Sequence, residues 1–242
     1  MPTKVTFIDK SDAIPEIFFP YPAARFLPQW YKDLAPWAEP HPDSNKYYSK
    51  LGTQTAKRCI PMFDALSSGY LIPLPFDIHV SKRPDGSLEY EWPDLLGDSN
   101  PSVGVTFHSK EQVSTYKKAE PFQDIPKLIT PWAFSTPRGY SMLFIPPMNR
   151  DDLKIEIFSG VIDTDKFHST GSFPFLLSDP NFEGLIPAGT PFAQAIPFKR
   201  EDFEMRMGDD ADRKKTRLSD ATVGRFFKDG YRKIMHTKKS YR

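Results

Sequence analysis

Two aspartates separated by one residue, Asp163 and Asp165, are the side chains of this 242-residue chain whose type and spacing best suit chemistry. They follow the apolar and polar alternation of residues 158–162 and stand beside a turn. Paired carboxylates can accept hydrogen bonds from a ligand, or one of them can activate a water molecule as a general base. We therefore take both as candidate catalytic residues.

Other reactive side chains form weaker patterns. The 5 histidines are scattered, without a His-x-Asp/Glu pair or a His-x-x-x-His spacing. His79, His108 and His168 could join Asp163 only if their strands converge, which would suit a metal-dependent oxygenase on a double-stranded β-helix. We assign no metal site on this basis. Neither of the two glycine-rich motifs that bind phosphate occurs.

Short strands joined by rigid turns must position these side chains. Strand periodicity dominates residues 153–198, and residues 4–8, 102–108 and 140–145 predict further strands. The clearest hairpin joins residues 70–82 to 87–92 through the turn Arg83-Pro84-Asp85-Gly86, because Pro presets φ and Gly tolerates positive φ. We predict a short helix within residues 53–70 and a proline-punctuated connection at residues 121–137.

Proline argues against long helices over most of the chain. Its 25 occurrences are roughly twice the usual share of about 5%, and each removes a backbone donor. We predict a mainly β fold, a jelly-roll or β-clip-like sandwich with short helices and a C-terminal helix. Residues 1–50 would form a proline- and aromatic-rich wrap, residues 51–200 the β domain, and residues 201–242 a polar linker with a basic C-terminal helix.

The charge distribution is uneven although the net charge is only +1. Residues 199–242 hold 14 Lys and Arg against 8 Asp and Glu. The basic tail, residues 213–242, also carries aromatic residues, which suits an acidic protein, a nucleic acid or a neighbouring subunit. A solvated helix packed by its own aromatic residues, among them Phe226 and Phe227, would explain the same pattern.

The N-terminus and the single cysteine bear on location. Residues 1–10 have charges where a signal peptide needs an apolar core, and no apolar run of 18 residues occurs. Cys59 has no partner for an internal disulfide, which fits a reducing compartment. We expect a soluble protein of the cytoplasm that makes no membrane contact and forms a homo-oligomer.

Residues 158–200 resemble the dUTPase and dCTP deaminase superfamily. The resemblance rests on GVIDTD at residues 160–165, followed by LIPAGTPFAQAI at residues 185–196, and more weakly on TPRGYS at residues 136–141. It implies a trimeric β enzyme in which Asp163 activates a water, Arg138 and Ser141 belong to a phosphate-binding segment, and Gln194 lies in the turn before the last strand. Mg²⁺ would be the implied cofactor.

The chain departs from this family at several places. Lys166 stands where a sugar-stacking aromatic is expected, and the glycine-rich C-terminal lid over the phosphates is absent. The whole chain also resembles a family of bacteriophage and bacterial proteins without an assigned activity. Our leading hypothesis is therefore a phage-encoded accessory protein that binds a ligand or partner, located in the host cytoplasm. A dUTPase-like enzyme is the alternative.

Overall fold

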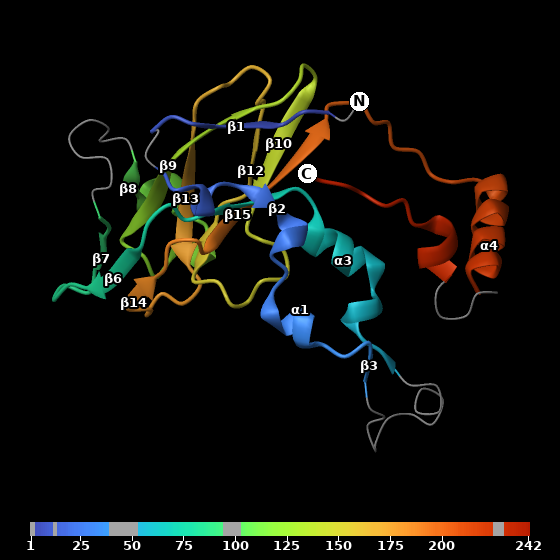
Figure 1. Ribbon diagram of the computed structural model, residues 1–242, viewed down its shortest axis with the longest axis horizontal. Helices are drawn as coiled ribbons and strands as arrows, with labels where there is room; N and C mark the ends of the chain where they lie inside the picture. The colour runs from blue at the N-terminus through green and yellow to red at the C-terminus, as the bar shows by residue number, and fades with distance from the viewer. Residues whose placement is uncertain (1–2, 12–13, 39–52, 94–102, 225–229) are drawn as a thin grey trace. The chain divides into compact units, whose positions relative to one another are not determined.

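The computed structural model describes residues 3–11, 14–38, 53–93, 103–224 and 230–242 (Figure 1). The chain divides into two compact units. Unit 1 contains Met1–Arg25 and Gly69–Arg200 together with Arg242, and unit 2 contains Phe26–Ser68 and Glu201–Tyr241. This division does not follow the three compositional segments 1–50, 51–200 and 201–242, whose independence as domains stays a prediction.

Two antiparallel sheets form the body of unit 1. The first has the order β1-β9-β13-β11, with β8 also paired to β9, and the second has the order β12-β10-β15-β5-β2. Their strands are β1 (Thr6–Asp9), β2 (Tyr21–Pro22), β5 (Tyr70–Pro73), β8 (Gly104–Ser109), β9 (Asp124–Ser135), β10 (Tyr140–Ile145), β11 (Ile155–Ile157), β12 (Gly160–Ile162), β13 (Thr170–Leu177) and β15 (Pro191–Lys199).

Phenylalanine rings join the two sheets in the core. Phe134 of β9 and Phe173 of β13 both contact Phe144 of β10, at centroid distances of 4.9 Å and 5.2 Å. Phe173 also lies 5.4 Å from Phe192 of β15. Each contact is edge-to-face, which the ring quadrupole favours by about 0.5–1.5 kcal/mol beyond the area that is buried. The high phenylalanine content of the sequence therefore forms the interior of a β sandwich.

A third sheet, of order β14-β6-β7, contains the predicted hairpin. β6 (Ile78–Lys82) and β7 (Leu88–Glu91) pair around the turn, where the N–H of Gly86 donates to the carbonyl of Arg83, and β14 (Gly184–Ile186) pairs with β6. The hairpin is confirmed. Residues 70–82 nevertheless form two strands, β5 in the second sheet and β6 in the third. The chain leaves the second sheet at Leu74, whose N–H donates to the carbonyl of Thr190.

The prediction of a connection at residues 121–137 is wrong, because this segment contains β9, the 12-residue strand of the first sheet. Residues 124–129 of β9 pair with β8 and residues 132–135 pair with β1. Pro131 falls between these two stretches, where the register with β13 also shifts. A proline, which has no backbone donor, is tolerated at such an irregularity of a strand.

Unit 2 consists of short elements. These are α1 (Gln29–Asp33), β3 (Trp37–Ala38), β4 (Thr53–Gln54), α3 (Ile60–Ser67), α4 (Asp210–Gly224) and a single helical turn, Tyr231–Met235. The Nζ of Lys57 donates to the carbonyls of Tyr31 and Lys32 at 2.8 Å and 3.0 Å, which satisfies acceptors at the end of α1. The C-terminal stretch attaches to α3 because Nε2 of His236 lies 3.2 Å from the carboxylate of Asp64.

The C-terminal helix begins earlier than the sequence suggested. We expected residues 201–242 to begin with a polar linker and to end in a basic helix, but α4 already starts at Asp210. Asp209 caps it: its Oδ1 accepts from the N–H groups of Ala211 and Asp212, and its own N–H donates to Asp212. Phe226 and Phe227, which were predicted to pack this helix, lie outside the described residues.

The fold class is confirmed at the level of a mainly β protein with an antiparallel sandwich, short helices and a C-terminal helix. The choice between a jelly roll and a β-clip stays a prediction. Within the described residues, no helix combines the length and the apolar character that a membrane crossing requires.

Candidate functional site

The turn that follows β12 carries both candidate aspartates and leads from the second sheet to the first. Thr164, between them, is 1% exposed and anchors the turn to the end of β9. Its hydroxyl lies 2.7 Å from that of Thr136, and its carbonyl accepts from the N–H of Thr136 at 3.2 Å. The carbonyl of Asp163 then accepts from the N–H groups of Lys166 and Phe167, which closes the turn. This local bonding presents two carboxylates on either side of a buried threonine.

Asp165 is enclosed and fully engaged. Its side chain is 2% exposed. Oδ1 accepts from Nη1 of Arg200 at 2.9 Å, while Oδ2 accepts from Nη2 of Arg200 and from the N–H of Gly139. The bonds from the guanidinium, followed by the Gly139 N–H, lower the pKa of Asp165 to about 2. Asp165 is therefore an anionic structural anchor and not a proton acceptor.

Asp163 is held at one oxygen only. Its Oδ1 accepts from the hydroxyl of Ser141 at 2.6 Å and lies 3.1 Å from Nη1 of Arg200. Its side chain is 51% exposed, and its Oδ2 has no hydrogen bond within the described part of the chain. The Ser141 hydrogen bond and then the charge of Arg200 lower the pKa of Asp163, although partial burial opposes them. Asp163 presents one oriented, ionised oxygen to solvent.

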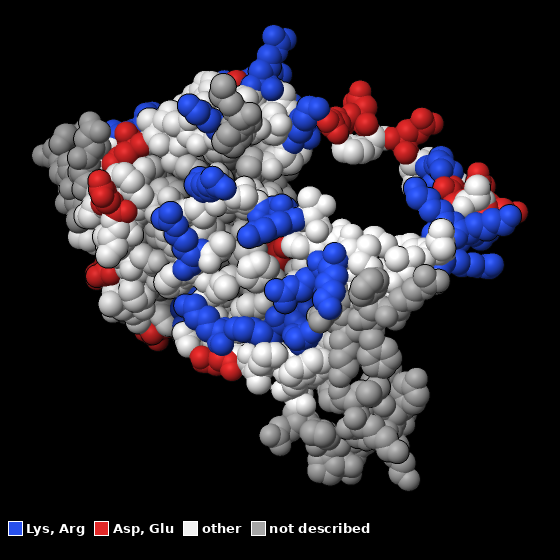
Figure 2. All heavy atoms as spheres, turned by 45° about the vertical axis from the view of Figure 1, so that its right-hand side comes forward, with Lys and Arg blue, Asp and Glu red and all other residues white. Residues whose placement is uncertain are grey.

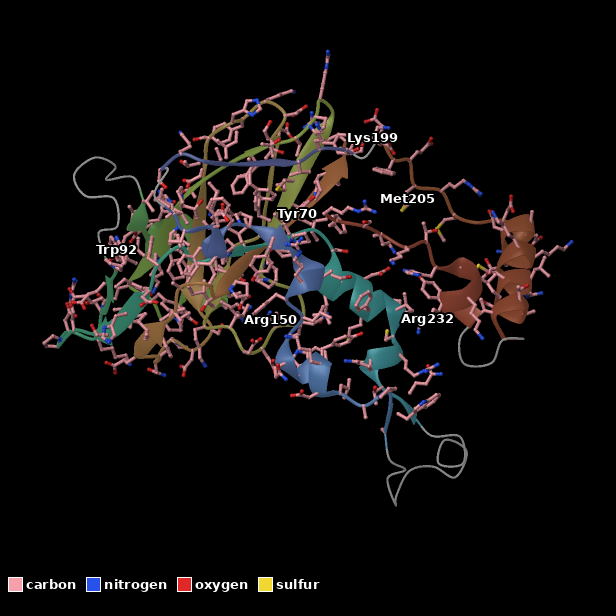
Figure 3. All side chains as sticks on the ribbon, in the orientation of Figure 1. Tyr70, Trp92, Arg150, Lys199, Met205 and Arg232 are labelled. Atoms are coloured by element: carbon pink, nitrogen blue, oxygen red, sulfur yellow. The ribbon has the colours of Figure 1, made fainter. Side chains whose placement is uncertain are left out.

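Arg200, which the sequence did not single out, is the centre of this cluster. It follows Lys199, the last residue of β15, which Figure 3 labels. Lys199 pairs with Tyr140 at the start of β10. The backbone N–H of Arg200 donates to the carbonyl of Gly139 at 2.8 Å. Its Nη1 also donates to the carbonyl of Tyr140 at 3.0 Å and to the Ser141 hydroxyl at 2.9 Å. The guanidinium thus links both aspartates to the start of β10.

The remaining predicted site residues take different positions. Ser141 is fully buried and belongs to the cluster, whereas Arg138 is exposed on the turn immediately before it. Gln194 is buried at 1% exposure, opposite Ile145 on β10, and its Oε1 accepts from the N–H of Met148 at 2.9 Å. It precedes Arg200 by six residues, about 20 Å along an extended strand. Gln194 therefore stabilises another turn and does not share the aspartate cluster.

The histidines do not assemble. The Nδ1 of His79 lies 3.8 Å from Glu91 on the β6–β7 hairpin, and both side chains are more than half exposed. His168 is exposed and His236 contacts Asp64 in unit 2, while His41 lies outside the described residues. Among the residues described, no three His, Cys, Asp or Glu side chains are grouped closely enough to hold a metal ion. These residues therefore provide no set of metal ligands for the oxygenase hypothesis.

The electrostatics of the cluster favour binding over proton transfer. A general base works best with a pKa near the working pH, but the pKa of each aspartate is lowered. Mg²⁺ would find a single open carboxylate oxygen here, next to a guanidinium. Since Mg²⁺ is commonly held by one or two carboxylates together with substrate phosphates, these residues fit the ion only when a phosphate-bearing ligand supplies further oxygens.

Comparison with known proteins yields structural neighbours alone. No protein-family model and no curated protein matches the chain. The structural neighbours are phage dUTPases, the group that residues 158–200 resemble in sequence. A mutant dUTPase from phage phi11 of S. aureus, whose structure details the coordination of a structural Mg(II) ion, is 10% identical with a TM-score of 0.34, over 86% of this chain and 97% of that one.

A mutant dUTPase of Staphylococcus bacteriophage 80alpha with dUpNHpp is 13% identical with a TM-score of 0.29, over 60% of this chain and 77% of that one. The 80alpha dUTPase itself is 12% identical with a TM-score of 0.25, over 55% of this chain and 96% of that one. These TM-scores are too low to transfer site residues from one chain to the other.

Proposed function

We propose that this protein acts by binding, and that the turn carrying Asp163 is a ligand site. The observation that carries the proposal is the state of the Asp163 carboxylate, of which one oxygen is held by Ser141 and Arg200 while the other is open to solvent. Such a group is already oriented, so little side-chain entropy is lost when a donor approaches it. Its lowered pKa keeps it anionic at neutral pH.

The ligand that suits this site carries a hydrogen-bond donor for Asp163 and an anionic group for a neighbouring cation. Arg138 is exposed on the turn that leads into Ser141, and Lys166 is exposed three residues after Asp163. Lys166 is close to the carboxylate along the chain, and Arg138 lies three residues before Ser141, whose hydroxyl donates to that carboxylate. This combination of one fixed anion and two exposed cations supports binding of a small zwitterionic or phosphate-bearing molecule.

A second candidate function is nucleotide hydrolysis of the dUTPase type. The favouring observation is that the open oxygen of Asp163 could accept a proton from a water molecule while Ser141 and Arg200 fix the other oxygen. Arg138 would contact the phosphates, and Mg²⁺ would reach the site with the nucleotide. The lowered pKa of Asp163 makes it a weak base, which is why we place this function second.

Calorimetric titration with dUTP and dCTP, with and without Mg²⁺, tests both functions when the products are also followed by chromatography. Saturable heat without product formation supports binding, and Asp163→Asn should weaken it about tenfold, a typical loss for one charge-assisted hydrogen bond. The exposed Asp151→Asn is the matched control and should bind as the wild type does. If the wild type hydrolyses a nucleotide and Asp163→Asn does not, the protein is a hydrolase and the binding proposal is wrong. If neither heat nor turnover is observed, these nucleotides are not its ligands.

The proposal also covers the source, the cellular location and the partners of the protein. We infer a phage-encoded accessory protein of the host cytoplasm that assembles as a homo-oligomer, supported by the sequence resemblance. Figure 2 shows Lys and Arg side chains crowded on α4 with Asp and Glu among them, and Arg213 is paired with Asp210 there. Residues 213–242 thus remain a candidate surface for an acidic protein or nucleic acid. If this tail contacts phosphates, the affinity of the protein for a DNA oligonucleotide should fall steeply as the salt concentration rises.

A further inference from the structure

Unit 1 contains a cavity of about 400 Å³ that is not lined by the Asp163 cluster. It lies between the turn of the β6–β7 hairpin, the residue Phe107 on β8, the segment 121–124 that leads into β9, and residues 180–181. Four stretches that are distant in sequence therefore converge on it. Its volume is at the lower end of the roughly 300–1,000 Å³ range of small-molecule pockets, which suits a molecule of one or two rings.

The cavity wall is mainly polar but includes three aromatic side chains, those of Tyr90, Phe107 and Phe122. Tyr90 and Phe122 are buried, at 7% and 4% exposure, whereas Phe107 is 49% exposed. The rings of Tyr90 and Phe107 are in contact, with centroids 5.8 Å apart and planes tilted by 55°. Tyr90 is supported from behind by Phe175, edge-to-face at 5.8 Å. Phe107 is thus a rigidly backed ring whose other side is accessible, which is the arrangement that stacking of a planar ligand requires.

Polar groups near these rings lack partners. The hydroxyl of Tyr90 is buried and makes no hydrogen bond within the described part of the chain. Burial raises the pKa of Tyr90, so the hydroxyl keeps its proton and remains a donor. Gln123 and Asp124 line the same cavity, are exposed, and make no side-chain hydrogen bond to a described residue. A buried donor without an acceptor is unfavourable unless water or a ligand accepts its hydrogen bond.

The charges of the lining residues balance in number, because Lys82 and Arg83 stand against Asp85 and Asp124. Lys82 donates from Nζ to Asn181 at 2.8 Å, and Nη2 of Arg83 lies 2.9 Å from Glu89. Asp85 accepts from both the N–H and the hydroxyl of Ser87. The rim therefore holds its own shape and does not select a strongly charged molecule. The open groups are an aromatic face, an amide and one carboxylate, which together match a neutral ring that carries N–H donors and carbonyl or ring-nitrogen acceptors.

We propose that this cavity binds a small neutral heteroaromatic molecule, of the size and chemistry of a free nucleobase or nucleoside. The ring stacks on Phe107, its donors face Asp124 and Gln123, and an acceptor on the ring reaches the Tyr90 hydroxyl after a small local adjustment. This assignment is independent of the proposed ligand site at the Asp163 turn, which shares no residue with the cavity.

Calorimetric titration of the full chain with adenosine and with uridine tests the proposal, and ribose serves as the probe that lacks a ring. We expect saturable binding of at least one nucleoside and none of ribose. Phe107→Ala should weaken the affinity about tenfold or more, because stacking of a base on an aromatic side chain is typically worth that much. Phe203→Ala, which removes a ring that is 88% exposed, is the control and should leave the affinity unchanged.

Tyr90→Phe gives a second readout that does not depend on a truncated ring. The substitution keeps the packing against Phe107 and Phe175 but removes the unpartnered hydroxyl. It should raise the melting temperature of the free protein and reduce the additional stabilisation that the nucleoside provides. The proposal is overturned if neither nucleoside binds at millimolar concentration, if ribose binds equally well, or if a folded Phe107→Ala binds as the wild type does.

Discussion

Gly69, which precedes β5, allows a quantitative test of how the second sheet is assembled. Its φ is +70°, and a Cβ added to it would lie 2.1 Å from the carbonyl oxygen of Ala195 on β15 and 3.0 Å from the carbonyl carbon. Gly86, at the tip of the β6–β7 hairpin, has a φ of +84° with no atom within 4 Å of the corresponding position. Alanine at the two positions therefore shares the backbone strain but differs in steric overlap.

The expected costs follow from this difference. A left-handed backbone costs an alanine about 1–2 kcal/mol, of which about 0.4–1 kcal/mol is offset by the lower entropy of the unfolded chain. Gly86→Ala should thus destabilise the fold by about 1 kcal/mol. Gly69→Ala adds an overlap with backbone atoms that cannot rotate away, which we place at about 2 kcal/mol from the usual cost of overpacking. Its total is about 3 kcal/mol.

Thermal unfolding followed by circular dichroism measures both variants. A chain of this size loses about 2–4 °C in melting temperature for each kcal/mol, so we expect decreases of about 2–4 °C for Gly86→Ala and about 6–12 °C for Gly69→Ala. Denaturant titration should rank them in the same order. If Gly69→Ala were no more destabilising than Gly86→Ala, the close approach of Gly69 to β15, and with it the pairing of β5 and β15, would be wrong.

Three further predictions concern charge, core packing and capping. The pKa of Asp165 is lowered to about 2 from 3.8, so its contribution to stability is present above about pH 4 and is lost as the pH falls through 2. Asp165→Asn should therefore unfold more easily than the wild type at pH 7. In urea titrations, the difference in free energy of unfolding between the two proteins should disappear between pH 4 and pH 2. Phe192→Ala should cost about 3–5 kcal/mol because the ring is fully buried, whereas Phe203→Ala should leave the urea midpoint unchanged. Asp209→Ala should cost about 1 kcal/mol of helix stability in α4, seen as faster amide exchange in its first turn, and equal exchange would contradict the capping geometry.

Local patterns in the sequence determined individual elements. Residues 140–145 were predicted as a strand and form β10 with the same bounds, and the turn at residues 83–86 joins β6 to β7 as expected. These features depend on side-chain alternation and on the φ preferences of Pro and Gly, which act over a few residues. The placement of Asp163 and Asp165 beside a turn was readable for the same reason.

The tertiary structure alone decided how these elements meet. Arg200 joins the aspartate cluster because the β10–β15 pairing brings it to Tyr140, which is 60 residues away in the chain, and no local pattern encodes that pairing. Long-range pairing also turns a proline-rich stretch into β9, since it leaves Pro131 between the partners β1 and β8. The same pairing gave Asp163 and Asp165 different roles: one side chain is enclosed by a guanidinium, and the other keeps an oxygen open to solvent.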